Sequence, residues 1–181
     1  MFCPIIANKG FSYIKKGDEA MSETHESILP ERGEDALMGK YLIFSMGKEL
    51  YGIEIKNITE IIGMQPVTSM PEMPHYVKGI TNLRGKIIPV MDARMRFGML
   101  EKEYDDRTCI IVIEAGGKTT GLIVDRVVEV ITLSEEEISP PLDINGSANR
   151  FIKGFGKAGG KVELLVDCQT LMGNESFAIA L

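Results

Sequence analysis

The chain has 181 residues, of which 44% are hydrophobic and 25% charged, and its formal net charge is -6. This composition is typical of a soluble globular protein with a sizeable core, in one or two small domains. The acidic balance, without a cluster of lysines and arginines, argues against a protein that coats nucleic acid or an anionic membrane.

The first 38 residues carry more acidic than basic side chains and show no lasting hydrophobic period. They predict a flexible N-terminal tail. From Gly39 onward, residues 41–46 and 50–55 are rich in aromatic and β-branched side chains around a Gly47-Lys48 turn, which predicts a β-hairpin. Isoleucines then recur at helical spacing, so residues 55–62 are expected to form one or two turns of helix with an apolar face.

Three prolines between residues 66 and 74 indicate a loop. Residues 77–92 then read as strand, glycine turn and strand. Because Pro89 cannot donate a ladder hydrogen bond, its strand is expected to be an edge or to carry a bulge. Asp92 is placed to N-cap a short helix over residues 93–97, which Gly98 ends.

The second half of the chain repeats the first. Gly121 falls on Gly52 at an offset of 69 (121 − 52), and the same offset places Glu129 on Glu60. Further on, Gly154 falls on Gly79 at an offset of 75 (154 − 79). The difference of six is an insertion in the linker over residues 133–146, where Ser134 and Glu137 have the spacing of a helix capping box.

The protein is therefore interpreted as a tandem duplication of a five-strand unit of about 70 residues with a short terminal helix. Units of that size bury only about 60% of their unfolded surface, so the halves should share a hydrophobic interface. Short strands with glycine turns favour an all-β fold of two small antiparallel barrels. We expect the first barrel over residues 39–105, the second over 106–173, and a C-terminal tail over 174–181.

The repeat also shows which residues differ between the two halves. The second copy has Lys157-Ala158-Gly159 where the first has Asn82-Leu83-Arg84. Taken alone, Arg84 in a glycine-flanked turn is either an exposed anchor for a partner or a structural ion-pair donor. Since the scaffold of the second copy does without it, the comparison favours a function for Arg84.

The residues that carry chemistry do not form a catalytic pattern. The chain has three cysteines, Cys3, Cys109 and Cys168. Their odd number and long spacings argue against a disulfide framework or a zinc site and favour a reducing cytoplasm. Residues 154–159 read G-x-G-x-x-G but lead into an apolar strand, whereas the dinucleotide fingerprint opens a helix. No activating histidine accompanies a cysteine. We expect no enzyme activity, no metal and no cofactor.

The runs 78–85 and 87–94, preceded by residues 51–53 and 60–61 and followed by 124–127, closely resemble the CheW family of bacterial chemotaxis coupling proteins. The resemblance covers about residues 40–173. It implies two five-stranded SH3-like β-barrels around a common core, and no catalysis. It also implies a cytoplasmic adaptor, recruited to membrane receptor arrays without membrane insertion, that joins the tips of transmembrane chemoreceptors to the regulatory domain of the histidine kinase CheA.

Site residues follow from the same resemblance. Receptor helices dock in the family on an apolar groove between the halves, which matches Leu42, Ile55, Ile58, Ile61 and Val127 here. The other interpretation is that these five residues are all core. The polar partner-binding positions match Glu60, Gly79 and Arg84, and the candidate kinase contact is the loop around Leu142 and Ile144. Two alternatives stay open: a small-ligand-binding double barrel, and a detached regulatory domain of a chemotaxis kinase.

Overall fold

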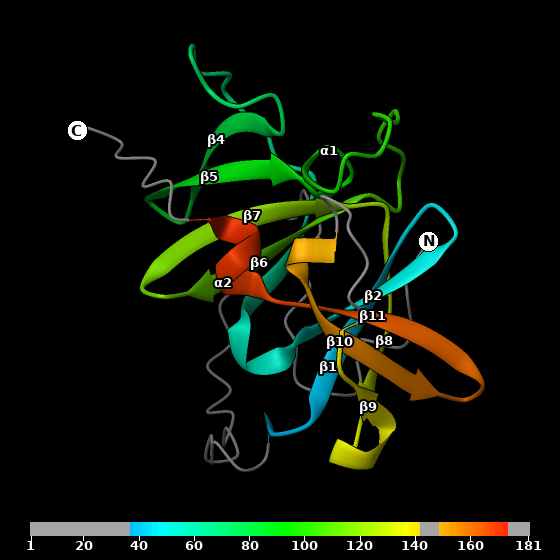
Figure 1. Ribbon diagram of the computed structural model, residues 1–181. Helices are drawn as coiled ribbons and strands as arrows, with labels where there is room; N and C mark the ends of the chain where they lie inside the picture. Colours follow the sequence, from blue (N-terminus) through cyan, green and yellow to red (C-terminus); the bar gives the residue numbers. More distant parts are fainter. Residues whose placement is uncertain (1–36, 142–148, 174–181) are drawn as a thin grey trace, which may run out of the picture.

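The computed structural model describes residues 37–141 and 149–173 (Figure 1). The candidate kinase contacts Leu142 and Ile144 lie outside these residues. The first copy of the repeat forms five strands, β1 (Lys40–Met46), β2 (Glu49–Glu54), β3 (Ile58–Gly63), β4 (Val77–Leu83) and β5 (Lys86–Asp92). The second copy forms the matching strands and an additional short one, β6 (Cys109–Ala115), β7 (Lys118–Val124), β8 (Arg126–Thr132), β9 (Ile138–Ser139), β10 (Ile152–Ala158) and β11 (Lys161–Val166).

The strands form two sheets, as the all-β prediction requires. The five-stranded sheet has the order β3-β6-β7-β5-β4, and the six-stranded sheet has the order β8-β1-β2-β11-β10-β9. All pairs are antiparallel except one in each sheet, β5 with β7 and β2 with β11. Figure 1 shows the two sheets lying one above the other, with their strands crossing.

The sheets do not follow the predicted division of the chain at residue 105. The hairpin β1–β2 of the first copy lies between β8 and β11 of the second, and the hairpin β6–β7 of the second copy lies between β3 and β5 of the first. Each sheet therefore contains strands of both copies. The repeat could not reveal this exchange, because duplicated strands have the same apolar pattern and bury the same faces whichever copy they pair with.

The repeated glycines Gly52 and Gly121 are explained by the exchange. Each lies on a hairpin strand where the parallel partner from the other copy crosses, Gly52 opposite Leu165 and Gly121 opposite Val90. A Cβ atom on Gly52 would lie 3.0 Å from the Leu165 side chain, and one on Gly121 would lie 2.8 Å from that of Ile110. Glycine is required at both positions because neighbouring side chains fill the space.

Alternate side chains of the central strands pack into different hydrophobic clusters, one between the two sheets and one within each sheet. On β6, Ile110 and Val112 join a cluster within the five-stranded sheet, whereas Ile111 and Ile113 face the large cluster shared by both sheets. On β1, Ile43 joins the smaller cluster of the six-stranded sheet. Strands buried on both faces read as continuous apolar runs, which is the pattern of residues 109–113.

The shared core between the sheets contains a chain of aromatic rings. Phe44 stacks on Tyr51 at 5.7 Å between ring centroids, Tyr51 meets Phe97 edge-on at 5.1 Å, and Phe97 meets Phe151 at 5.3 Å. Arg96 lies over Phe151 at 4.8 Å and donates from Nε to the carbonyl of Leu171. The halves thus share a hydrophobic interface, as predicted from the small size of each unit.

The helix α1 (Ala93–Arg96) begins as predicted. The Asp92 carboxylate accepts a hydrogen bond from the Met95 amide at 3.2 Å, and Asp167 caps α2 (Cys168–Met172) in the same way. The predicted capping box of Ser134 and Glu137 is present at a 3-10 helix, η3 (Glu135–Glu137).

Two local predictions are wrong. Residues 55–62 form a 3-10 turn, η2 (Ile55–Asn57), followed by strand β3, because pairing of β3 with β6 outweighs the helical spacing of the isoleucines. The strand of Pro89 is interior, between β7 and β4. Proline fits there because the parallel ladder to β7 starts only at Val90, and because Ile80, which lies opposite Pro89 on β4, exchanges its backbone hydrogen bonds with Thr68.

Candidate partner-binding site

Arg84 occupies a backbone conformation that suits glycine. Leu83 and Lys86 pair across a two-residue turn in which Arg84 has φ 50° and Gly85 has φ 86°. The turn of the second copy, Gly159-Gly160, has φ 56° and 79° at the same places. Two successive positive φ angles are typical of a type I′ hairpin turn, and for a residue with a Cβ the left-handed region costs about 1–2 kcal/mol.

The Arg84 side chain forms an ion pair and also faces solvent. Its Nη2 lies 3.1 Å from Oε2 of Glu60, and the arginine side chain is 62% exposed while that of the glutamate is 19% exposed. Oε2 of Glu60 is enclosed and accepts no hydrogen bond from the described residues, so the arginine neutralises it through charge alone. Arg84 is thus a structural ion-pair donor and an exposed cation, while its role as an anchor for a partner stays a prediction.

Asn82, the other residue that distinguishes the first copy, has a local role. Its Oδ1 accepts a hydrogen bond from the Gly85 amide at 2.8 Å, which closes the turn below Arg84. Asparagine side chains commonly stabilise turns in this manner. Asn82 therefore helps to hold Arg84 in its strained conformation.

Gly79 is buried rather than exposed to a partner. It has φ 143° at a register shift between β4 and β5, and a Cβ atom there would lie 2.1 Å from the carbonyl oxygen of Thr68. The Ile80 amide donates to that same oxygen at 2.9 Å. Because the loop backbone occupies the space of a side chain, any contribution of Gly79 to binding has to act through the shape of this loop.

The structure brings the five predicted groove residues together, but inside the protein. All five belong to the apolar cluster between the sheets and are buried: Leu42, Ile55, Ile58, Ile61 and Val127. Ile58 and Val127 keep the largest exposed fractions, at 9% and 8%. In the free chain these side chains pack as core, and their role in receptor docking stays a prediction.

Two of the exposed apolar residues occupy equivalent positions in the repeat, and the sequence analysis did not predict them. Ile87 near the start of β5 is 44% exposed, and Val162 near the start of β11 is 57% exposed. They are equivalent in the repeat at the offset of 75 (162 − 87) and lie just after the two hairpin turns. The offset itself could have signalled them, because both copies keep a β-branched residue directly after the first lysine of the strand.

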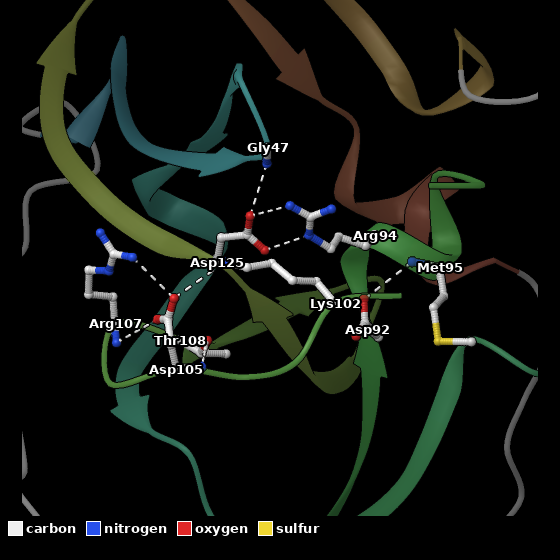
Figure 2. A network of polar contacts seen from close by, with 9 residues as sticks. All are labelled: Gly47, Asp92, Arg94, Met95, Lys102, Asp105, Arg107, Thr108 and Asp125. Atoms are coloured by element: carbon white, nitrogen blue, oxygen red, sulfur yellow. Dashed lines mark hydrogen bonds and ion pairs between the residues drawn. The ribbon is translucent and has the colours of Figure 1, made fainter. Parts of the chain in front are cut away.

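A network of polar contacts joins the two sheets where the chain crosses between them (Figure 2). Asp125 is the single residue between β7 and β8, and its carboxylate receives Nε and Nη2 of Arg94 at 2.6 and 2.5 Å and the Gly47 amide at 2.9 Å. The side chains of Arg94 and Asp125 are each only 16% exposed. The arginine is the main cause that holds the pKa of Asp125 below its usual value.

Below Asp125, the loop that follows α1 is tied to the same region. Tyr104 donates its hydroxyl hydrogen to Asp92 at 2.8 Å. Asp105 accepts hydrogen bonds from Lys102 and Arg107 (Figure 2). Backbone and side-chain hydrogen bonds from Arg107 lower the pKa of Asp105. Asp125 thus links the Gly47 turn of the six-stranded sheet to Arg94 on α1, which follows the five-stranded sheet. These contacts help to fix the position of one sheet relative to the other.

The described residues offer little for catalysis. No group of three or more His, Cys, Asp or Glu side chains in residues 37–141 and 149–173 is arranged to hold a metal ion. Burial raises the pKa of both Cys109 and Cys168 to about 12, and a thiol needs to ionise to act as a nucleophile. The described surface instead carries the exposed cation of Arg84 in a hairpin turn and the exposed apolar side chains of Ile87 and Val162 beside the two turns.

The sequence model of the CheW-like domain matches residues 40–176, which include every strand described above. The chain belongs to the CheW family. It is 37% identical over 141 residues to the chemotaxis protein CheW of Klebsiella aerogenes, covering 77% of this chain and 85% of that protein. It is 35% identical over 139 residues to the CheW of Rhizobium meliloti, covering 76% of this chain and 90% of that protein.

A solved CheW structure has the same fold. The scaffolding protein CheW of Thermoanaerobacter tengcongensis matches with a TM-score of 0.71 and 37% sequence identity, over 75% of this chain and 92% of that chain. This match supports the CheW fold as two small, curled β-sheets, in line with the predicted SH3-like barrels. None of the helices in the described part of the chain has the length and hydropathy of a membrane-spanning helix.

Proposed function

We propose that this chain is a non-enzymatic adaptor that couples transmembrane chemoreceptors to the histidine kinase CheA in bacterial chemotaxis. Its relatives carry the name chemotaxis protein CheW, and the solved neighbour is called a scaffolding protein. It acts in the cytoplasm and is recruited to receptor arrays at the membrane. Its partners are the cytoplasmic tips of the receptors and the regulatory domain of CheA.

The conformation of Arg84 carries this proposal. A residue in a left-handed turn could be glycine, as Gly159 is in the second copy, and glycine would relieve the backbone strain while removing the ion pair to the largely buried Glu60. Retaining arginine at a conformational cost is understandable if its exposed guanidinium contacts a partner. Receptor binding is therefore assigned to Arg84 and Glu60, with Gly79 shaping the adjacent loop.

Receptor helices are proposed to dock over Ile58 and Val127, the least buried of the five predicted groove residues. Leu42, Ile55 and Ile61 would support this contact from beneath, because they belong to the same cluster. An amphipathic helix places its apolar residues into a groove of this kind. For the kinase we propose the loop around Leu142 and Ile144 together with the exposed side chains of Ile87 and Val162.

A small-ligand-binding function receives less support. Such a function needs a polar cavity between the sheets, whereas that space holds the aromatic chain from Phe44 to Phe151 and the apolar cluster around it. The detached kinase domain is also less well supported, because the chain spans 85% of the Klebsiella aerogenes CheW and 90% of the Rhizobium meliloti CheW.

Co-sedimentation with receptor-containing membranes and CheA tests the proposal. The wild-type protein should sediment with the membranes and should increase the CheA that sediments with them. Arg84→Asp should fold normally and lose much of this effect. A ternary complex that forms equally well with Arg84→Asp would contradict the assignment, and a wild-type protein that binds neither partner would contradict the adaptor function.

A variant with exchanged charges tests whether Arg84 contacts a partner or acts only through its ion pair with Glu60. In Glu60→Arg with Arg84→Glu the ion pair is restored with opposite polarity, while the exposed cation leaves the hairpin turn. If Arg84 contacts a partner, the double variant should stay as defective as Arg84→Asp. Recovery of the complex would show that the residue acts only through the ion pair.

A further inference from the structure

The smaller hydrophobic cluster of the five-stranded sheet and that of the six-stranded sheet differ at one equivalent position of the repeat. Ile88 on β5 belongs to the cluster within the five-stranded sheet. At the offset of 75 (163 − 88), β11 of the six-stranded sheet carries Glu163, which is buried to the same extent, since both residues are 3% exposed. A carboxyl group has therefore replaced an apolar residue inside one of two equivalent cores.

The carboxyl group of Glu163 is incompletely paired. Its Oε2 is enclosed and accepts no hydrogen bond from the described residues, and unlike Oε2 of Glu60 it has no ion-pair partner among them. The carboxylate lies over Gly156 of β10, where a Cβ atom would lie 3.6 Å from Oε2 and 2.6 Å from the Leu133 side chain. Enclosing an ionised carboxylate without a partner is costly, whereas the neutral acid is tolerated far better.

Two charged groups act on Glu163 from its surroundings. Glu129 on β8 disfavours its ionisation and Lys161 on β11 favours it, while the residues paired opposite it on β2 and β10, Leu50 and Gly156, carry no charge. Burial is the largest cause and raises the pKa of Glu163, although backbone hydrogen bonds from residues including Ala158 act in the other direction.

The hairpin that carries Glu163 is otherwise weakly built. Strand β10 contains Gly154 and Gly156, and its turn consists of Gly159 and Gly160. Glycines within a strand add no side-chain packing and increase the entropy lost on folding. Among the described residues, β10 pairs on its outer side with only the two residues of β9. The equivalent hairpin β4–β5 has an apolar residue at position 88 and the ion pair of Arg84 instead.

We propose that Glu163 makes the β10–β11 hairpin a proton-controlled opening element of the fold, which is closed over the neutral carboxyl group and loosened when that group ionises. Val162 lies next to Glu163 on β11, so an open hairpin also displaces this exposed apolar residue. The opening is a property of the free chain, so the inference does not rest on the proposed partners.

The direction of the pH effect follows from the two states. In the open hairpin Glu163 ionises near its ordinary pKa of 4.5, whereas in the closed hairpin its pKa is raised. Closure is therefore favoured most at low pH, and it weakens as the pH rises above the ordinary value toward the raised one. Asp125, whose pKa is lowered, has the opposite effect and loses its stabilising contribution in acid.

Hydrogen exchange of the full chain, followed by mass spectrometry and corrected for intrinsic rates, tests the proposal. Between about pH 5 and about pH 8, protection of peptides from β10–β11 should fall several-fold more than that of peptides from β4–β5. Glu163→Ile and Glu163→Gln should both remove this difference. The reciprocal variant Ile88→Glu should transfer the pH dependence to β4–β5.

Two outcomes would overturn the proposal. One is equal pH dependence of the two hairpins in the wild-type protein. The other is a β10–β11 hairpin that keeps its pH dependence in both Glu163 variants. Because the wild type and the two Glu163 variants are decisive, a failure of Ile88→Glu to fold leaves the test intact.

Discussion

Arg84 and Glu60 belong to opposite edges of the five-stranded sheet, yet their Nη2 and Oε2 atoms lie 3.1 Å apart. Glu60 is on the edge strand β3, and Arg84 is in the turn that ends the other edge strand, β4. The sheet has to curl on itself to bring these residues together. The ion pair thus joins the two edges of the curled five-stranded sheet, and the arginine remains accessible to a partner.

Arg84→Gly should separate stability from binding. Glycine removes the left-handed strain of about 1–2 kcal/mol, and this offsets much of the cost, about 1–3 kcal/mol, of leaving the enclosed Oε2 of Glu60 without its ion-pair partner. We expect a melting temperature close to that of the wild type by calorimetry and weaker recruitment of CheA to receptor membranes. A large drop in melting temperature would show that the pair is chiefly structural.

Asp125→Asn should destabilise the protein by roughly 3 kcal/mol in urea unfolding, because it leaves the largely buried Arg94 without its counter-charge. Lys102→Ala, which removes an exposed ion pair to Asp105, is a matched control with little effect. An equally small effect of both changes would contradict the structural role of the Asp125 network.

The pH dependence of the same variant provides an independent check. The pKa of Asp125 is lowered from 3.8, so its contribution is complete above that value and is lost as the pH falls through the lowered pKa. The stability difference between wild type and Asp125→Asn should therefore be constant near neutrality and shrink in acid. A difference that grows in acid would have the wrong sign.

Gly79→Ala should unfold the protein or destabilise it by more than about 2 kcal/mol, since its methyl group would overlap the Thr68 carbonyl at a positive φ. Gly85→Ala is the matched control, because it also has a positive φ but open space around it, and should cost only about 1 kcal/mol. Urea unfolding measures both. Similar values would mean that the Thr68 loop moves freely.

Cys109 and Cys168 should resist alkylation in the native protein near neutral pH, because burial raises the pKa of both thiols to about 12 and keeps reagents away. In denaturant both should react at the rate of free cysteine. Mass spectrometry after peptide digestion assigns the sites. Fast labelling of either residue in the native state would indicate local opening around it.

Most strands and their faces could be predicted from residue patterns. The turns at residues 47–48 and 84–85 and the caps Asp92 and Ser134 depend on local geometry, and local sequence determines that geometry. The prediction for residues 55–62 was wrong because the spacing of four isoleucines fits a helix and also fits a bulged strand. Pairing with β6 decided between them.

The sequence by itself determined the all-β class, the duplication and the isolation of Arg84 as the residue that only one copy carries. Only the tertiary structure decided that hairpins are exchanged between the copies, that the groove isoleucines pack as core, and that Glu60 is the partner of Arg84. These depend on contacts between residues far apart in the chain. Equivalent repeats offer the same apolar faces to either copy, so the pairing is settled by how all strands pack together.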